Sequence, residues 1–214
     1  MGRWEPGARG RLAKSAMALY AEQGFDQTTV AEIAAGAGLT ERTFFRHFAD
    51  KREVLFYGMG MLRGLLVHAV TDAPASSTAM DAVGAAFEAA GAVLQENPER
   101  VRLRDAIVSA NPELRERELI KLAALASAMA SALRDRGIAE PAASLAAETG
   151  AAVFRIAFAR WISETGQPDL PGIFRESMED LRGVLAVRAP HDHDLPGHRD
   201  AVAAPAAVAG LRAG

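Results

Sequence analysis

The sequence predicts an all-α fold. Alanine supplies 46 of the 214 residues, and alanine has the highest helix propensity of all residues. Aromatic residues make up only 6% of the chain, and β-branched residues are sparse, so a strand-rich fold is not expected. Apolar residues recur at steps of three and four along most of the chain, which is the spacing of amphipathic helices. Short helices at the N-terminus are followed by longer ones.

Cap residues mark the first two helices. Residues 9–23 place an apolar stripe on one side of a helix, and Gly24 ends it. A second helix begins at Thr29, where Glu32 follows at the spacing of a capping box. Gly38 breaks this helix, because glycine adopts the positive φ angles of tight turns without strain.

Two more helices follow at once. Thr40 is a good N-cap for a short helix over residues 40–47. Asp50 caps the next helix, with Glu53 at its third position, and the apolar pattern extends that helix to about residue 70.

Longer helices fill the rest of the chain. Asn-Pro or Glu-Pro pairs open three of them, since proline is favoured at the first helical position. Residues 189–214 are rich in proline, histidine and alanine, and we expect them to be disordered. The longer helices are expected at residues 79–96, 98–110, 112–136, 141–165 and 171–187. The expected domains are residues 1–55, 56–188 and the tail 189–214.

Composition also excludes several classes of function. The chain has no cysteine, which excludes disulfides, zinc–thiolate sites and thiol catalysis. The longest uncharged stretch, residues 122–133, is too short to span a bilayer, and residues 1–14 lack the apolar core of a signal peptide. Glycine-rich phosphate loops, Gly-x-Ser-x-Gly and His-Glu-x-x-His are absent from the sequence. We therefore expect a cytoplasmic protein without a membrane partner, catalytic residues or cofactors.

The net charge of the chain is weak evidence for or against a nucleic-acid partner. The total is −3, but residues 1–60 carry 8 Lys/Arg against 7 Asp/Glu, and residues 61–214 carry 16 against 20. The acidic excess therefore lies in the second domain. Local placement of basic residues decides nucleic-acid binding more than the total does.

Residues 29–48 have the spacing of a helix-turn-helix. Ala34 is the small residue needed where the two helices cross, and Gly38 supplies the tight turn. The second helix buries Leu39, Phe44 and Phe48 against the first. Its outward side chains suit a helix that enters the major groove with its N-terminal end. The alternative is a plain three-helix hairpin in a helical core, because this spacing also occurs without DNA binding.

The chemistry of each side chain indicates a role. Arg42 is the best candidate to read guanine, since a guanidinium can bond O6 and N7 together. Thr40 and Thr43 suit phosphate or thymine-methyl contacts. Glu41 suits cytosine N4 or its own helix N-terminus. The remaining phosphate-contact candidates are Thr29, Arg46, His47 and Lys51.

Residues 24–55 resemble the DNA-binding domain of the TetR family of bacterial transcriptional regulators. The resemblance rests on Gly24-Phe25, Thr28-Thr29-Val30, Ile33-Ala34, Ala37-Gly38-Leu39-Thr40, Thr43, Arg46-His47-Phe48, Lys51 and Leu55. Phe45 departs from the pattern, because the family usually has a tyrosine there whose hydroxyl bonds a phosphate. The nominated DNA contacts are Thr28, Thr29, Thr40, Glu41, Arg42, Thr43, Phe45, Arg46, His47 and Lys51.

The resemblance implies a ligand-binding and dimerising second domain. Residues 151–162 are apolar nearly all round, so that helix needs two partners, and we expect one of them to be the same helix of a second subunit. A central helix of a monomeric bundle is the alternative. The expected dimer-interface residues are Phe154, Phe158, Trp161, Phe174, Met178, Leu181 and Leu185.

The effector pocket is expected among apolar and sulfur-containing side chains, which suit a deformable cavity for a small hydrophobic effector. The alternative for each of these side chains is that it packs in the hydrophobic core and lines no pocket. Arg100, Arg102 and Arg104 are candidates to neutralise an acidic head group of the effector. The lining candidates are Met59, Leu62, Leu66, Met80, Phe87, Leu103, Ile107, Leu122, Met129, Phe154 and Phe158.

The tail residues His191, Asp192, His193, Asp194 and His198 are ligand types for zinc or nickel, but proline-rich surroundings offer no scaffold, so no metal site is expected. The predicted function is a sequence-specific transcriptional regulator. We expect a homodimeric repressor that binds palindromic double-stranded DNA and is released by a small hydrophobic effector. The alternative is a helical interaction or DNA-binding protein without effector response.

Overall fold

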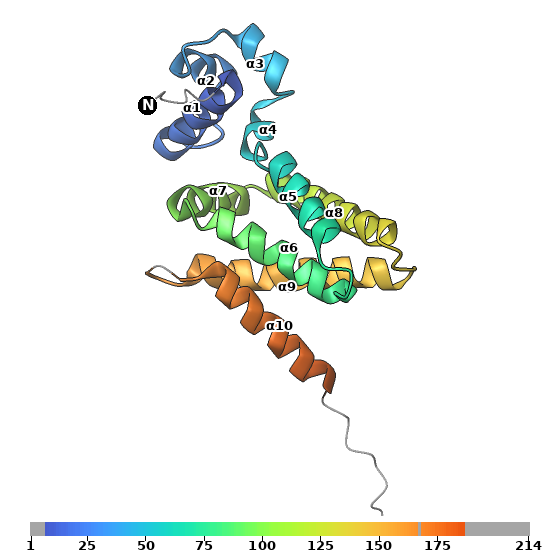
Figure 1. The fold of residues 1–214 in the computed structure, drawn as a ribbon. Helices are drawn as coiled ribbons and strands as arrows, with labels where there is room; N and C mark the ends of the chain where they lie inside the picture. The colour runs from blue at the N-terminus through green and yellow to red at the C-terminus, as the bar shows by residue number, and fades with distance from the viewer. Residues whose placement is uncertain (1–6, 167, 187–214) are drawn as a thin grey trace, which may run out of the picture.

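The computed structural model describes residues 7–166 and 168–186, which form ten α-helices and no strand (Figure 1). The tail residues 189–214, with their histidines, lie outside the described part. The all-α prediction is confirmed. The helices are α1 (Ala8–Gln23), α2 (Val30–Gly36), α3 (Glu41–His47), α4 (Lys51–Leu55), α5 (Met59–Asp72), α6 (Ala79–Leu94), α7 (Pro98–Ala110), α8 (Pro112–Asp135), α9 (Ala142–Ser163) and α10 (Leu170–Ala186).

Two groups of helices follow each other along the molecule. Helices α1 to α3 lie together at one end, and α4 leads into a layered group made by α5 to α10 (Figure 1). Each group has a buried apolar cluster. The first includes Leu12, Ile33 and Phe44 but also takes in Val108 and Leu114 from α7 and α8. The first core therefore extends past residue 55 and joins the two groups.

The N-caps expected at Thr29, Thr40 and Asp50 are in place. The Thr29 hydroxyl accepts from the amide of Glu32 at 3.2 Å, and the Glu32 carboxylate accepts from the amide of Thr29 at 2.8 Å. The Thr40 hydroxyl accepts from the amide of Thr43 at 3.2 Å. The Asp50 carboxylate accepts from the amide of Glu53 at 2.9 Å. These bonds satisfy amides that a helix leaves unpaired at its start, which is why α2, α3 and α4 begin where predicted.

The prediction of a single helix over residues 50–70 is wrong. Helix α4 ends at Leu55, and Phe56, Tyr57 and Gly58 form a tight turn before α5. The amides of Phe56, Tyr57 and Met59 each bond a carbonyl three residues back, at 3.0 to 3.2 Å, which is the tighter 3₁₀ pattern. The Phe56 ring is buried, with the Arg104 guanidinium 5.0 Å and the Lys121 ammonium 5.3 Å from its centroid. Burial of this aromatic, together with the low helix propensity of glycine, outweighs continuation of the α-helix.

Helices α6 and α9 approach each other closely at Gly150. A Cβ built on Gly150 would lie 2.2 Å from Val83 Cγ1 and 3.1 Å from Phe87 Cε2. The second core forms around this crossing and includes Phe87, Trp161 and Phe174. Among the described helices, only α9 is long and apolar enough to cross a membrane. It packs against α6, α8 and α10, and a single helix of this kind is weak evidence for a membrane span.

The Thr78–Asp81 capping box at the start of α6 gives a pH-dependent stability. Bonds from the hydroxyl and amide of Thr78 hold the pKa of Asp81 below its ordinary value. A lowered folded-state pKa stabilises the protein above the unfolded-state pKa of about 3.9, and this stability is lost as the pH falls through the folded-state value. The melting temperature of Asp81→Ala should therefore lie below that of the wild type at pH 7, and the gap should narrow as the pH falls below the unfolded-state pKa. Glu22→Ala, which removes an exposed carboxylate from α1, is the control; a gap independent of pH would contradict this account.

Candidate nucleic-acid interface

Helices α2 and α3 are joined by the turn that the sequence predicts. Gly38 has a φ of +67°, and the Leu39 amide donates to the Ala34 carbonyl at 2.8 Å. Ala34 is buried where α2 meets its neighbours, and Phe44 is completely buried on the inner side of α3. Only small side chains allow two helices to cross this closely, so the motif has the geometry of a helix-turn-helix.

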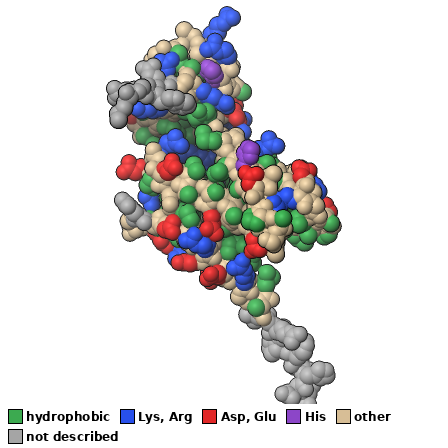
Figure 2. Space-filling model, in the orientation of Figure 1, with side chains coloured by type: hydrophobic (Ala, Val, Ile, Leu, Met, Phe, Trp, Pro, Cys, Tyr) green, Lys and Arg blue, Asp and Glu red, His purple; other side chains and the backbone are tan. Residues whose placement is uncertain are grey.

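The outer side of α3 carries exposed side chains of several kinds. Glu41, Arg42 and Arg46 are exposed. Phe45 is 55% exposed and meets the buried Phe44 ring edge-on at 5.4 Å. Blue basic side chains are visible at the α1–α3 end of the molecule, and acidic ones are spread over the other helices (Figure 2). This surface offers groups that bond bases and phosphates, beside one apolar ring.

Several nominated threonines already have structural partners. The Thr29 and Thr40 hydroxyls cap α2 and α3, and the Thr40 and Thr43 hydroxyl oxygens lie 3.1 Å apart. Thr28 is only 1% exposed, and its hydroxyl donates to the Gly24 carbonyl at 2.7 Å. The structure therefore places Thr28 inside the domain, away from the surface that the sequence assigned to it.

His47 and Lys51 also differ from the sequence-based expectation. The Nε2 atom of His47 is buried and has no partner within the described residues. The ammonium of Lys51 is directed at the loop between α1 and α2, where it bonds three backbone carbonyls. Neither group points freely into solvent. The phosphate contacts expected of these two residues remain untested, but the structure shows internal surroundings for both.

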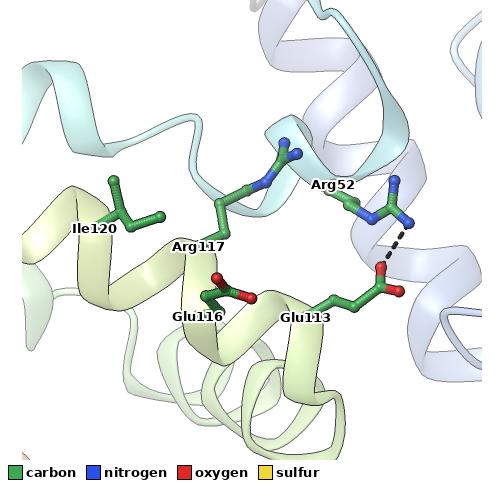
Figure 3. A pocket seen from close by; sticks show the side chains of 5 residues that line it. All are labelled: Arg52, Glu113, Glu116, Arg117 and Ile120. Atoms are coloured by element: carbon green, nitrogen blue, oxygen red, sulfur yellow. Dashed lines mark hydrogen bonds and ion pairs between the residues drawn. The ribbon is translucent and has the colours of Figure 1, made fainter.

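Ion pairs join α4 to α8 across the junction of the two domains. Arg117 pairs with Asp50 at 3.2 Å and with Glu53 at 2.7 Å, and Lys121 pairs with Glu53 at 3.0 Å. Arg52 of α4 reaches Glu113 of α8 at 2.6 Å beside a groove of about 500 Å³ (Figure 3). Nothing in the sequence indicates this network, because its partners lie more than 60 residues apart in the chain.

Comparison with known proteins supports the geometry. Residues 12–57 match the family described as bacterial regulatory proteins, tetR family. This part of the chain belongs to the TetR family. It covers α1 to α4 and ends within the turn that follows α4.

Relatives of the TetR-family domain are transcriptional regulators. The regulator TcmR of Streptomyces glaucescens is 36% identical over 81 residues, which are 38% of this chain and 36% of TcmR. The repressor KstR2 of Mycobacterium tuberculosis is 43% identical over 58 residues, 27% of this chain and 28% of KstR2. The chain thus matches about a third of the length of these relatives. A crystal structure of Thermus thermophilus FadR, a TetR-family transcriptional repressor in complex with lauroyl-CoA, shares the fold at 24% identity and a TM-score of 0.57, over 85% of this chain and 97% of that one.

Outside the TetR-family domain, the nominated pocket residues do not surround one space. Leu103 and Ile107 of α7 belong to the first core, beside the helix-turn-helix, and Met59 contacts both cores. The aromatic members pack on one another, with the Phe87 and Phe154 rings stacked at 4.8 Å. The other candidates line the second core: Leu62, Leu66, Met80, Leu122, Met129 and Phe158.

The nominated dimer residues are mostly interior. Trp161, Phe174 and Met178 are buried within one chain, and the indole N–H of Trp161 donates to the Pro168 carbonyl at 2.9 Å. Phe154, Phe158 and Leu181 are partly buried against the same core. Leu185 is exposed, as that prediction requires. Sequence periodicity could not separate the two apolar sides of α9. The large apolar side chains that α9 and α10 expose are Leu145, Ile156, Val184 and Leu185.

Proposed function

We propose that this chain is a sequence-specific DNA-binding transcriptional regulator that acts as a homodimeric repressor. The observation that carries the proposal is the exposed set on α3, where Arg42, Phe45 and Arg46 stand outward from a capped helix. The membership of residues 12–57 in the TetR family supports the assignment. In this proposal residues 1–55 bind DNA, and residues 56–188 bind the effector and dimerise.

A second copy is needed for tight reading of a palindrome, because each short helix reads only one major groove. The apolar side chains that α9 and α10 leave exposed, Ile156 and Leu185 among them, offer the surface for it. Monomeric proteins rarely leave large contiguous apolar patches in water. The dimer interface proposed here therefore uses the outer sides of α9 and α10 and not the buried Trp161 or Phe174.

The proposed effector is a small hydrophobic molecule that binds among the apolar side chains of the second core. Lauroyl-CoA, the ligand of the Thermus protein, is a suitable first probe because it combines a long apolar chain with an anionic head. The stacked Phe87 and Phe154 rings favour the alternative of a DNA-binding protein without effector response. Release of bound DNA by lauroyl-CoA or another hydrophobic molecule would exclude that alternative.

Selection from a pool of random duplexes tests the DNA-binding proposal. We expect the wild type to enrich a palindrome whose half-sites are centred about 10 base pairs, or a multiple of this, apart. Arg42→Ala should weaken binding to the selected duplex by about 1–3 kcal/mol and relax the preference for guanine at one position of each half-site.

Arg63→Ala is the matched control, because Arg63 is an exposed arginine on α5, away from the helix-turn-helix. It should bind as the wild type does. Failure of the wild type to enrich any sequence would overturn the proposed function.

A further inference from the structure

Lys51 is the first residue of α4, and its side chain crosses to the loop that precedes α2. Its Nζ atom donates to the carbonyl oxygens of Phe25 at 2.9 Å, Asp26 at 3.1 Å and Thr28 at 2.9 Å. A lysine ammonium has three N–H donors and no acceptor. The three carbonyls therefore use its whole donor capacity.

Further contacts fix Lys51 in this position. The ammonium lies 4.6 Å from the centroid of the Phe25 ring, which adds a cation–π attraction. At the other end of the residue, the Tyr20 hydroxyl donates to the Lys51 carbonyl at 2.7 Å. Burial, with the nearby Asp50 charge, raises the pKa of Tyr20 well above its ordinary value, so the hydroxyl stays protonated and remains a donor. Lys51 thus ties α4 to α1 and to the loop between α1 and α2.

The loop held by Lys51 decides where α2 begins. It ends at Thr29, the N-cap of α2, and the next turn of α2 packs Ile33 and Ala34 into the first core. Three carbonyl oxygens converge on one point, and without a cation their dipoles would repel one another. The position of α2, and of α3 packed on it, therefore depends on a charge supplied from α4.

We propose that Lys51 is a positioning residue for DNA binding: its ammonium holds the loop of residues 25–28, and with it the start of α2, in the geometry that presents α3 to the major groove. Its positive charge interacts with these carbonyls and does not neutralise a phosphate. This inference rests on the proposed DNA-binding function. It assigns Lys51 a role different from the phosphate contact expected of a lysine at a helix N-terminus.

Two variants of Lys51 separate positioning from phosphate contact. Lys51→Arg keeps the positive charge and a phosphate-binding group, but a planar guanidinium does not match three carbonyls that converge on one nitrogen. Lys51→Met keeps an unbranched side chain and removes the charge. Positioning predicts that both variants lose about tenfold or more in DNA affinity, whereas phosphate contact predicts that Lys51→Arg binds as well as the wild type.

Salt dependence gives the second readout. The affinity for a duplex selected by the wild type is measured from 50 to 200 mM salt, at a temperature where circular dichroism shows each variant to be fully helical. Loss of one phosphate contact lowers the slope of log affinity against log salt by about 0.9. We expect Lys51→Met to leave the slope unchanged, and Arg46→Gln, which removes an exposed cation of α3, to lower it. A lowered slope in Lys51→Met together with full affinity in Lys51→Arg would overturn the proposal.

Amide hydrogen exchange tests the same contact without DNA. Exchange at residues 25–33 should quicken in both Lys51 variants and in Tyr20→Phe, while α6 stays as protected as in the wild type. Unchanged exchange in this loop would contradict the positioning role even if the protein bound no DNA. Failure of the wild type to bind any duplex, with quickened exchange in the variants, would instead overturn only the proposed function. If Lys51→Met does not fold, hydrogen exchange in Lys51→Arg and Tyr20→Phe tests the contact in its place.

Discussion

Replacing Phe44 with alanine is expected to lower the free energy of unfolding by about 3–5 kcal/mol, the range for truncating a fully buried phenylalanine. Phe44 has no exposed surface, and its ring contacts Phe48 with centroids 5.6 Å apart. It fills the space between α3 and the rest of the first core, so its loss leaves a cavity under the proposed recognition helix. Denaturant titration followed by circular dichroism measures the change.

Phe45→Ala is the matched control, because it removes the same side chain one position along the same helix. Phe45 is 55% exposed, so its truncation should cost less than about 1 kcal/mol of stability. It should instead weaken DNA binding, since its ring stands on the outer side of α3. Equal losses of stability in the two variants would contradict the orientation of α3 described here.

Substitution of Gly150 is expected to have the second largest effect. The added methyl of Gly150→Ala would lie 2.2 Å from Val83 Cγ1, and that valine is completely buried. Val83 or the two helices must therefore shift, which costs about 1–3 kcal/mol, as overpacking of a core does. Differential scanning calorimetry should show a lower melting temperature.

Gly84→Ala is the control for helix propensity. Gly84 lies within α6, and a Cβ at that position would meet nothing within 4 Å. Alanine there should raise stability by up to about 1 kcal/mol, because it is the better helix former. The two substitutions therefore have opposite expected signs. A Gly150→Ala variant as stable as the wild type would mean that α6 and α9 do not meet as closely as the structure has them.

Local chemistry made the first domain predictable. Thr29, Thr40 and Asp50 are followed at fixed short spacings by their bonding partners, so the starts of α2, α3 and α4 could be stated from the sequence. Gly24 and Gly38 have the positive φ angles expected of chain reversals. These features involve residues within a few positions of one another, where periodicity and capping rules apply.

Contacts distant in sequence were not predictable in the same way. The apolar pattern of α9 indicates that the helix needs partners on two sides, but not that Trp161 faces the core of its own chain while Ile156 faces outward. Its apolar side chain made Ile107 a candidate for the effector pocket, but α7 directs it into the first core. The three carbonyl partners of Lys51 could not be stated from the sequence, because they lie 23 to 26 residues away.

The turn at Phe56–Gly58 changes how motion can pass between the two domains. A continuous helix from Asp50 onward would act as a rigid rod, and any displacement of α5 would reach α3 as a translation of the same size. The turn instead allows the dihedral angles of three residues to act as a pivot. Because α4 has only five residues and is held by Lys51 to the first domain and by Glu53 to α8, we expect a shift of α8 to be passed to α4 and the first domain together. In the proposed homodimer, such a movement would change the separation and tilt of the two α3 helices together, and a small displacement in the second domain would then take both out of register with successive major grooves.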